Sequence, residues 1–194
     1  MPETTIRPAG TPAEDREALK RILGVPAGGR LLVMAGGSMG CGPIPQIATL
    51  LHPRLGEKDR LVVVCGSNKA MYRRLRAVFR RSKRVQILGY TRDMARLVRA
   101  ADLLITKAGG LSTTEAVAAE TPILYINAVP GCESRNLQFM TAHGYAAAGK
   151  HAWDVAERAE ELLRDSEARE AMVEARRGKF PADAAETICQ TIGV

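Results

Sequence analysis

The residues LLVMAGGSMGCGPIPQIATLL (31–51) decide the fold class. They begin with a continuous apolar run, pass through a loop with four glycines in seven positions, and end in a helical pattern (44–51) with a proline near its first turn. Apolar runs that are continuous rather than alternating are typical of strands buried on both faces. The stretch therefore predicts a buried strand, a glycine-rich loop and a helix.

Four further apolar runs of this kind follow, at 61–65, 85–88, 102–106 and 122–126. Helical patterns surround them, and we expect helices at 15–23, 71–79, 93–100, 113–119, 133–142, 153–177 and 182–192. Alternating strands and helices predict a Rossmann-like, doubly wound parallel α/β sheet, because parallel neighbours need right-handed crossovers. With 194 residues, 46% of them hydrophobic, the chain has room for one domain, which we place at 13–194 after a linker at 1–12.

Sheets of this class bind ligands beyond the carboxyl ends of the strands, where the strand order reverses. If the order is 3-2-1-4-5, the loops at that point follow the first and fourth strands. Those loops are AGGSMGCGP (35–43) and KAGGLSTTE (107–115), the two most glycine-rich stretches of the chain. We therefore expect the binding site between them.

The first loop, 35–43, has two interpretations. Its glycines permit positive φ and close approach, and the helix behind it would offer free N–H groups to a diphosphate. Alternatively, it is a tight turn whose glycines serve packing. No GK[ST] closes the loop, and the second strand ends in CGSN (65–68) without the acid that holds the ribose of NAD. The sequence therefore disfavours a dinucleotide enzyme.

The second loop brings the glycine pair 109–110 to a helix start with three hydroxyl side chains at 112–114. Ser112 and Glu115 have the spacing of a capping box. Alternatively, the Glu115 carboxylate accepts hydrogen bonds from both hydroxyls of a ribose. One role does not exclude the other if the helix start is the binding site.

The string ADLLITKAGGLSTTEAVAAETPILYINAVPGCESRN (101–136), with AGGSMGCGP before it and GYTRDM at 89–94, resembles one glycosyltransferase group. That group contains the processive diacylglycerol glucosyltransferases, the monogalactosyldiacylglycerol synthases and, more distantly, the transferase that completes lipid II. The similarity covers roughly residues 15–165. It implies the C-terminal, nucleotide-sugar-binding half of a GT-B fold, with a UDP-sugar as donor substrate, inversion at the sugar, and neither a cofactor nor a metal. The absence of a D-x-D triplet agrees with this implication.

Carried onto this sequence, the resemblance implies a set of binding residues. Backbone around Thr91 would bind the uracil and Glu115 the ribose, and the two glycine-rich loops would surround the diphosphate. Glu133 and Asn136 match the acid and the Asn of the family's P-G-Q-E-x-x-N motif, which bind the hexose. The motif's Gln is Cys132 here, which leaves the identity of the sugar open. The implied residues are Gly37, Ser38, Thr91, Gly109, Gly110, Leu111, Ser112, Thr113, Glu115, Glu133 and Asn136.

In this family the base that deprotonates the acceptor belongs to the amino-terminal domain. The resemblance therefore implies no catalytic residue in this chain, a lipid acceptor such as diacylglycerol bound by a missing domain, and no reaction by this chain alone. Three alternatives stay open: a UDP-sugar 2-epimerase of the same fold, a separate chain that pairs with a membrane-bound acceptor subunit, and a non-catalytic nucleotide-binding module.

The segment 73–84 contains seven basic residues and no acid: Arg73, Arg74, Arg76, Arg80, Arg81, Lys83 and Arg84. It is either a solvated helix face or a surface for anionic lipid, near which each cation contributes about 1 kcal/mol. We expect no nucleic-acid partner, because aromatic residues make up only 4% of the chain and none is interleaved with the cations. Lys107, before the glycine pair, could likewise bind a phosphate or be solvated.

The remaining reactive side chains indicate no metal site. The four cysteines form no CxxC pair, which is typical of a reducing compartment, and the three histidines form no H-x-x-x-H pair. We expect structural histidines, with His143 capping the end of a helix. No apolar run reaches the ~18–20 residues of a membrane span, and the first residues lack the apolar core of a signal peptide. We expect a cytoplasmic protein that can associate peripherally with the inner face of the membrane.

Overall fold

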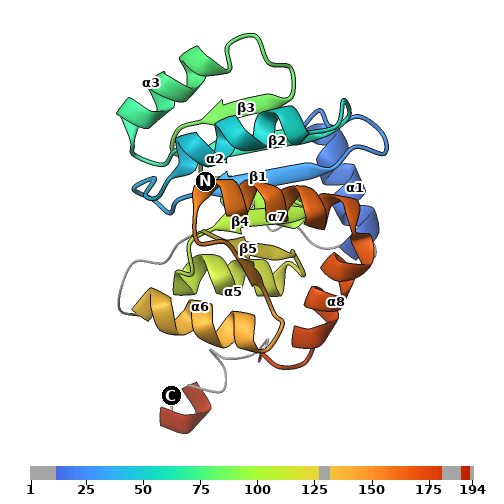
Figure 1. The fold of residues 1–194 in the computed structure, drawn as a ribbon. Helices are drawn as coiled ribbons and strands as arrows, with labels where there is room; N and C mark the ends of the chain where they lie inside the picture. Colours follow the sequence, from blue (N-terminus) through green and yellow to red (C-terminus); the bar gives the residue numbers. More distant parts are fainter. Residues whose placement is uncertain (1–11, 127–131, 181–188, 193–194) are drawn as a thin grey trace, which may run out of the picture.

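The computed structural model describes residues 12–126, 132–180 and 189–192. Its centre is a parallel sheet with the strand order β3-β2-β1-β4-β5-β6 (Figure 1). The strands are β1 (Leu31–Ala35), β2 (Arg60–Val64), β3 (Val85–Leu88), β4 (Leu103–Thr106), β5 (Ile123–Tyr125) and β6 (Ala147–Ala148). The predicted fold class and the order of the first five strands are confirmed. The short β6 was not predicted, because two alanines carry no strand signal.

The strands are apolar throughout because helices cover both faces of the sheet. All five residues of β1 are buried, and successive side chains point to opposite faces. Leu32 and Met34 belong to one hydrophobic cluster, whereas Leu31 and Val33 belong to the other. The continuous apolar runs of the sequence thus reflect two cores, one on each side of the sheet.

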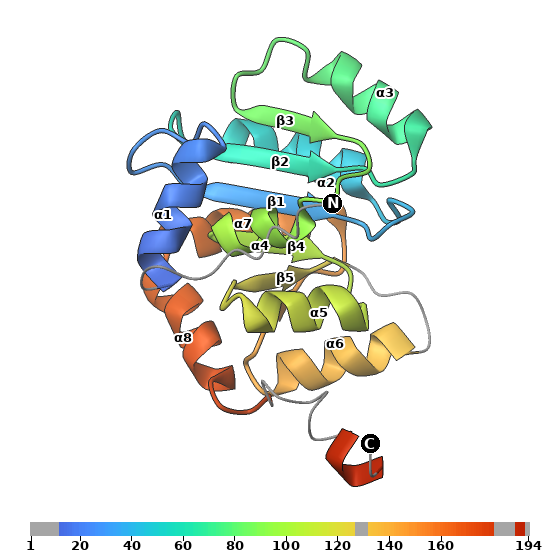
Figure 2. The ribbon, with the colours of Figure 1, turned by 180° about the vertical axis from the view of Figure 1, so that it is seen from behind.

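One core lies under α2 (Ile44–Leu51), α3 (Lys69–Val78) and α7 (Ala152–Arg164), and Figure 1 shows α2 and α7 in front of the sheet. The opposite core lies under α4 (Met94–Ala100), α5 (Gly110–Ala118) and α6 (Cys132–Ala142), with α1 (Pro12–Ile22) beside α4 (Figure 2). A short 3₁₀ helix, His52–Arg54, follows α2. Because helices cover both faces, loops occupy the edge of the sheet at which the strands end.

Several helix boundaries differ from the prediction. The single helix expected at 153–177 is divided into α7 and α8 (Ser166–Arg176), because Asp165 has an extended backbone and its side chain caps α8 by accepting from the Ala168 amide at 2.8 Å. The first helix begins at Pro12, three residues before the expected start. Residues 1–11 of the expected linker and 182–188 of the expected last helix lie outside the described residues.

A buried arginine fixes α8 to the end of α5. The Arg176 guanidinium donates to the carbonyl oxygens of Tyr145 (3.1 Å), Ala116 (3.3 Å) and Thr121 (2.6 Å). Burial lowers the pKa of Arg176 to about 10. The described helices include none that is long and apolar enough to cross a membrane.

Candidate functional site

The two glycine-rich loops leave the sheet next to each other. β1 and β4 are neighbouring strands with Ala35 opposite Thr106, and the Thr106 hydroxyl donates to the Ala35 carbonyl oxygen at 2.9 Å. The strand order reverses between β1 and β4. Both loops therefore lie at the point where sheets of this class bind ligands.

The first loop, 36–43, lies against the second loop through a glycine. Gly37 has a φ of 75°, and a Cβ atom added to it would lie 2.9 Å from Cε of Lys107. A larger residue at Gly37 would be strained and would push the lysine away. The exposed Ser38 is held from the other side, because its carbonyl oxygen accepts hydrogen bonds from the amide (2.8 Å) and the hydroxyl (3.1 Å) of Ser67.

The second loop leads directly into α5. Gly109 is the N-cap and no side chain caps the helix. Of the two interpretations of Ser112 and Glu115, the capping box is therefore wrong, because α5 starts at Gly110 and Ser112 is already its third residue. Within the described residues, the amides of 110–112 have no hydrogen-bond acceptor. Unpaired N–H groups at the positive end of a helix dipole are suited to an anion.

Thr113 faces the interior. Its hydroxyl lies 2.8 Å from the buried Tyr125 hydroxyl, and its amide donates to the Gly109 carbonyl oxygen at 3.0 Å. Burial raises the pKa of Tyr125, although its hydrogen bond with Thr113 and the charge of Arg176 oppose that rise. The expectation that all three hydroxyls of 112–114 are presented at the helix start is thus corrected for Thr113.

Glu115 and Thr91 take no part in the contact between Thr113 and Tyr125. Glu115 is exposed on α5, and its carboxylate has no ion-pair or hydrogen-bond partner among the described residues. Thr91 follows β3, and its hydroxyl accepts from the Asp93 amide at 3.0 Å, which shapes the turn before α4. Leu111, at the start of α5, is 82% exposed. The first turns of α5 therefore expose an apolar side chain and a carboxylate.

Two side chains of α6 contact the second loop. The Asn136 side-chain amide donates to the Ala108 carbonyl oxygen at 3.0 Å, and a Glu133 carboxylate oxygen lies 2.5 Å from the Lys107 ammonium. The structure thus joins Glu133 and Asn136 to the second loop. The Lys107–Glu133 ion pair was not predicted, because its partners are 26 positions apart in the sequence and belong to different elements, so no local pattern indicates their contact. The Cys132 side chain and residues 127–131 lie outside the described residues.

Two histidines and one cysteine have structural environments. His143 Nδ1 lies 2.8 Å from the Phe139 carbonyl oxygen, which confirms its capping role at the end of α6. His52 Nε2 lies 3.0 Å from the Ser82 hydroxyl, and burial followed by the nearby Arg84 charge lowers its pKa. Burial also raises the pKa of Cys65 to about 11, which keeps this thiol protonated. The described part of the chain contains no group of three or more His, Cys, Asp or Glu side chains that could hold a metal ion.

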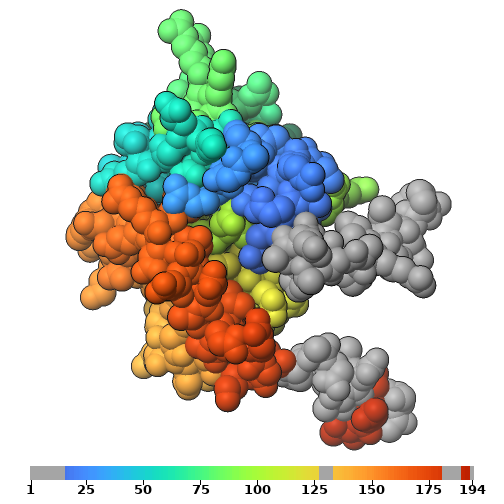
Figure 3. Space-filling model, turned by 90° about the vertical axis from the view of Figure 1, so that its right-hand side faces the viewer, coloured from blue at the N-terminus to red at the C-terminus, as the bar shows by residue number. Residues whose placement is uncertain are grey.

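The basic excess of the chain is confined to one part of the fold. Residues 60–92 contain ten of the 28 Lys and Arg residues and none of the 21 acids, so the rest of the chain has 18 cations against 21 carboxylates. None of the seven cations of 73–84 forms an ion pair within the described residues. In Figure 3 the green part of residues 60–92 projects at the top of the molecule. We call 73–84 the basic segment.

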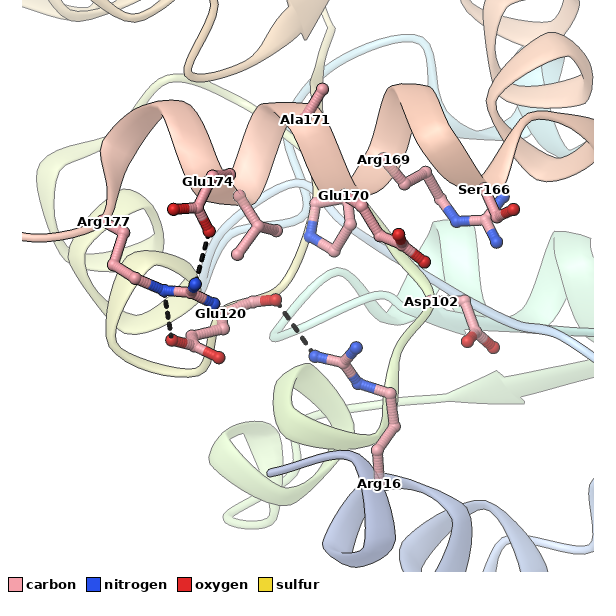
Figure 4. Close-up of a pocket in the computed structure, with 11 residues that line it drawn as sticks. Arg16, Asp102, Glu120, Ser166, Arg169, Glu170, Ala171, Glu174 and Arg177 are labelled. Carbon is pink, nitrogen blue, oxygen red and sulfur yellow. Dashed lines mark hydrogen bonds and ion pairs between the residues drawn. The ribbon is translucent and has the colours of Figure 1, made fainter. Parts of the chain in front are cut away.

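A charged cavity of about 570 Å³ lies at the opposite, amino edge of the sheet, between α8, α1 and the residues before β4 and β5 (Figure 4). Its charges largely satisfy one another. Arg177 pairs with Glu174 and lies 3.7 Å from Glu120, whose carbonyl oxygen accepts from Arg16 at 3.0 Å. Asp102 pairs with the buried Lys20 at 3.0 Å. These contacts fasten α8 and α1 to the sheet, far from the glycine-rich loops.

The parallel order and the loops at its reversal define a Rossmann-like domain of the kind found in GT-B glycosyltransferases. Residues 47–179 match the family model described as glycosyl transferases group 1. The chain belongs to this family. A processive diacylglycerol beta-glucosyltransferase from Bacillus pumilus is 31% identical over 164 residues, which is 84% of this chain and 42% of the relative. The chain therefore spans less than half the length of that relative.

Solved structures share the fold at lower identity. MurG from Acinetobacter baumannii has a TM-score of 0.71 and 20% identity, over 94% of this chain and 52% of that one. HepE from Anabaena, in complex with UDP-glucose, has a TM-score of 0.66 and 18% identity, over 93% of this chain and 52% of that one. At these identities the likeness concerns the fold alone.

Proposed function

We propose that this chain is the UDP-sugar-binding domain of an inverting, metal-independent hexosyltransferase with a lipid acceptor such as diacylglycerol. The observation that carries this proposal is the meeting of the two glycine-rich loops at the strand-order reversal, beside three unpaired α5 amides. Family membership and the diacylglycerol glucosyltransferase from Bacillus pumilus support the hexosyl transfer and the lipid acceptor. The complex of HepE with UDP-glucose supports the donor.

In this proposal each part of the donor has its place. The amides of 110–112 and the loop at Gly37 and Ser38 surround the diphosphate, Glu115 holds the ribose, and backbone around Thr91 contacts the uracil. Glu133 and Asn136 bind hexose hydroxyls. As the glycosidic bond breaks, negative charge grows on the departing UDP, and the preorganised α5 amides stabilise it.

The base that activates the acceptor hydroxyl belongs, in this proposal, to an acceptor domain beyond this chain. We further propose that the protein acts at the cytoplasmic face of a membrane, with the basic segment toward anionic lipid. The unpaired cations of that segment support this orientation, since each contributes about 1 kcal/mol near an anionic surface.

Calorimetric titration of the chain with UDP, with ADP and NAD as controls, tests the donor. We expect heat of binding for UDP only. Equal binding of ADP would reject uridine recognition, and absence of UDP binding would reject the donor-binding role for this chain. Binding of UDP-N-acetylglucosamine followed by its epimerisation would establish the epimerase alternative instead.

A further inference from the structure

Lys107 lies at the centre of the candidate site. It follows β4 directly, and the Gly109 amide donates to its carbonyl oxygen at 2.8 Å, so the chain turns sharply around it. Its side chain extends between the two glycine-rich loops, because a Cβ added to Gly37 would lie 2.9 Å from Lys107 Cε and one added to Gly109 would lie 4.0 Å from it. The lysine therefore occupies the region in which the donor diphosphate is proposed to bind.

The partner of Lys107 is the residue proposed to hold the hexose. The two side chains are 27% and 16% exposed, and their charged atoms are 2.5 Å apart. At this burial the pair is less screened by water and salt than a surface pair. While it persists, the Glu133 oxygen that faces the lysine is not available to a sugar hydroxyl, and the ammonium is not available to a phosphate.

We propose that donor binding exchanges these partners: Lys107 leaves Glu133 and binds the donor diphosphate, and the released Glu133 accepts hydrogen bonds from the hexose. The inference rests on the proposed function. Lysine suits the exchange because its four-carbon stem is flexible and its ammonium is a point charge that phosphates accept. Glu133 tolerates the exchange because it lies in the first turn of α6, where the helix dipole stabilises a carboxylate.

The exchange gives the site a preference for the intact donor over the product. UDP alone must break the ion pair and leaves Glu133 beside a diphosphate, which is a contact between like charges. A UDP-hexose breaks the same pair but supplies hydroxyls that donate to the carboxylate. Lys107 and Glu133 thus determine specificity together, and product release is favoured once the hexose has been transferred.

Calorimetric titrations of the chain with UDP and with UDP-glucose test the exchange. We expect K107Q to weaken UDP binding by about tenfold or more, the usual loss for a charge-assisted contact, and K107R to retain most of it. We expect E133Q to tighten UDP binding and to reduce the preference for UDP-glucose over UDP. K58Q, an exposed lysine variant at the amino edge of β2, is the matched control and should bind like the wild type.

The outcomes separate this inference from the proposed function. If the wild type binds UDP and K107Q binds it equally well, the exchange is overturned while the donor-binding role stands. Weaker binding of UDP by E133Q would also overturn it, because competition between Glu133 and the diphosphate would then be absent. A wild type that binds no UDP would reject the proposed function and this inference together. Thermal melting of each variant establishes that it is folded.

Discussion

The hydroxyls of Thr113 and Tyr125 lie 2.8 Å apart inside the protein. This contact joins α5, which begins at the candidate site, to the sheet strand β5. Thr113 lies among the residues that the family resemblance assigns to the diphosphate, yet its hydroxyl forms a hydrogen bond inside the core. At this helix start, the position of a residue in the sequence motif therefore does not determine the direction of its side chain.

Replacing Thr113 by Val separates the two roles. We expect T113V to lower the free energy of unfolding by about 1–2 kcal/mol, because the Tyr125 hydroxyl is left buried without its partner. UDP affinity should stay within about twofold of the wild type, as the hydroxyl does not reach a ligand. Denaturant unfolding and calorimetry measure the two quantities. In the double variant T113V/Y125F the stability loss should be smaller than the sum of the two single losses; a large loss of UDP affinity in T113V would contradict the structural role.

Asp59 is a structural residue whose contribution to stability depends on pH. Its carboxylate is 3% exposed and accepts from Arg30 Nε at 2.9 Å and Nη2 at 2.8 Å, and from the Gly56 amide at 2.9 Å. Burial acts to raise the pKa of Asp59, but these hydrogen bonds outweigh it and hold the pKa below the ordinary 3.8. A carboxylate whose pKa is lower in the folded state stabilises the fold above its unfolded pKa, and that stabilisation is lost as the pH falls through the folded pKa.

We expect D59N to lower the free energy of unfolding at neutral pH by about 2 kcal/mol. This is less than the loss for a fully buried pair, because Arg30 is 33% exposed. The difference between D59N and the wild type should shrink below about pH 4. Urea unfolding across pH measures it, with E57Q, an exposed carboxylate two residues away, as the control. A difference that does not change with pH would show that the charge of Asp59 is not what stabilises the fold.

The exposed Glu115 carboxylate gives the most direct test of the proposed ribose contact. We expect E115A to weaken UDP binding by about 1–3 kcal/mol, the cost of losing hydrogen bonds to a charged group, with little change in stability. E120A, at the other end of the helix, is a control for the loss of one carboxylate near α5. Unchanged UDP affinity in E115A would remove Glu115 from the ribose.

The basic segment predicts binding to anionic membranes. Sedimentation with vesicles that contain phosphatidylglycerol should retain the chain at low salt and release it at high salt, whereas neutral vesicles should not retain it. Removing four of the exposed cations, in R73Q/R74Q/R80Q/R81Q, should weaken retention by about tenfold or more.

The control for that variant removes the same total charge elsewhere, from exposed residues outside the segment: R21Q/K58Q/K150Q/K179Q. If both variants lose retention equally, net charge rather than the basic segment is responsible. Equal retention of the wild type by neutral and anionic vesicles would show that the basic segment is only a solvated surface.

The periodicity of the sequence was sufficient for the architecture. Runs such as 31–35 are apolar at every position because the sheet is covered on both faces, and that burial leaves a signal that needs no tertiary information. The same signal was absent for β6, whose two residues are alanines, and misleading at 153–177, where Asp165 interrupts an otherwise continuous helical pattern. The glycine-rich loops could be placed together because the common strand order of doubly wound sheets makes the first and fourth strands neighbours.

Only the tertiary structure decided which polar side chains at the site face one another. The Thr113 hydroxyl turns to Tyr125, and the Lys107 ammonium pairs with Glu133 across 26 residues of chain. Neither contact has a local signature, since each depends on where a second element packs. Sequence periodicity reports the burial of a strand or helix as a whole, whereas the direction of a single polar side chain is set by its nearest partners in space.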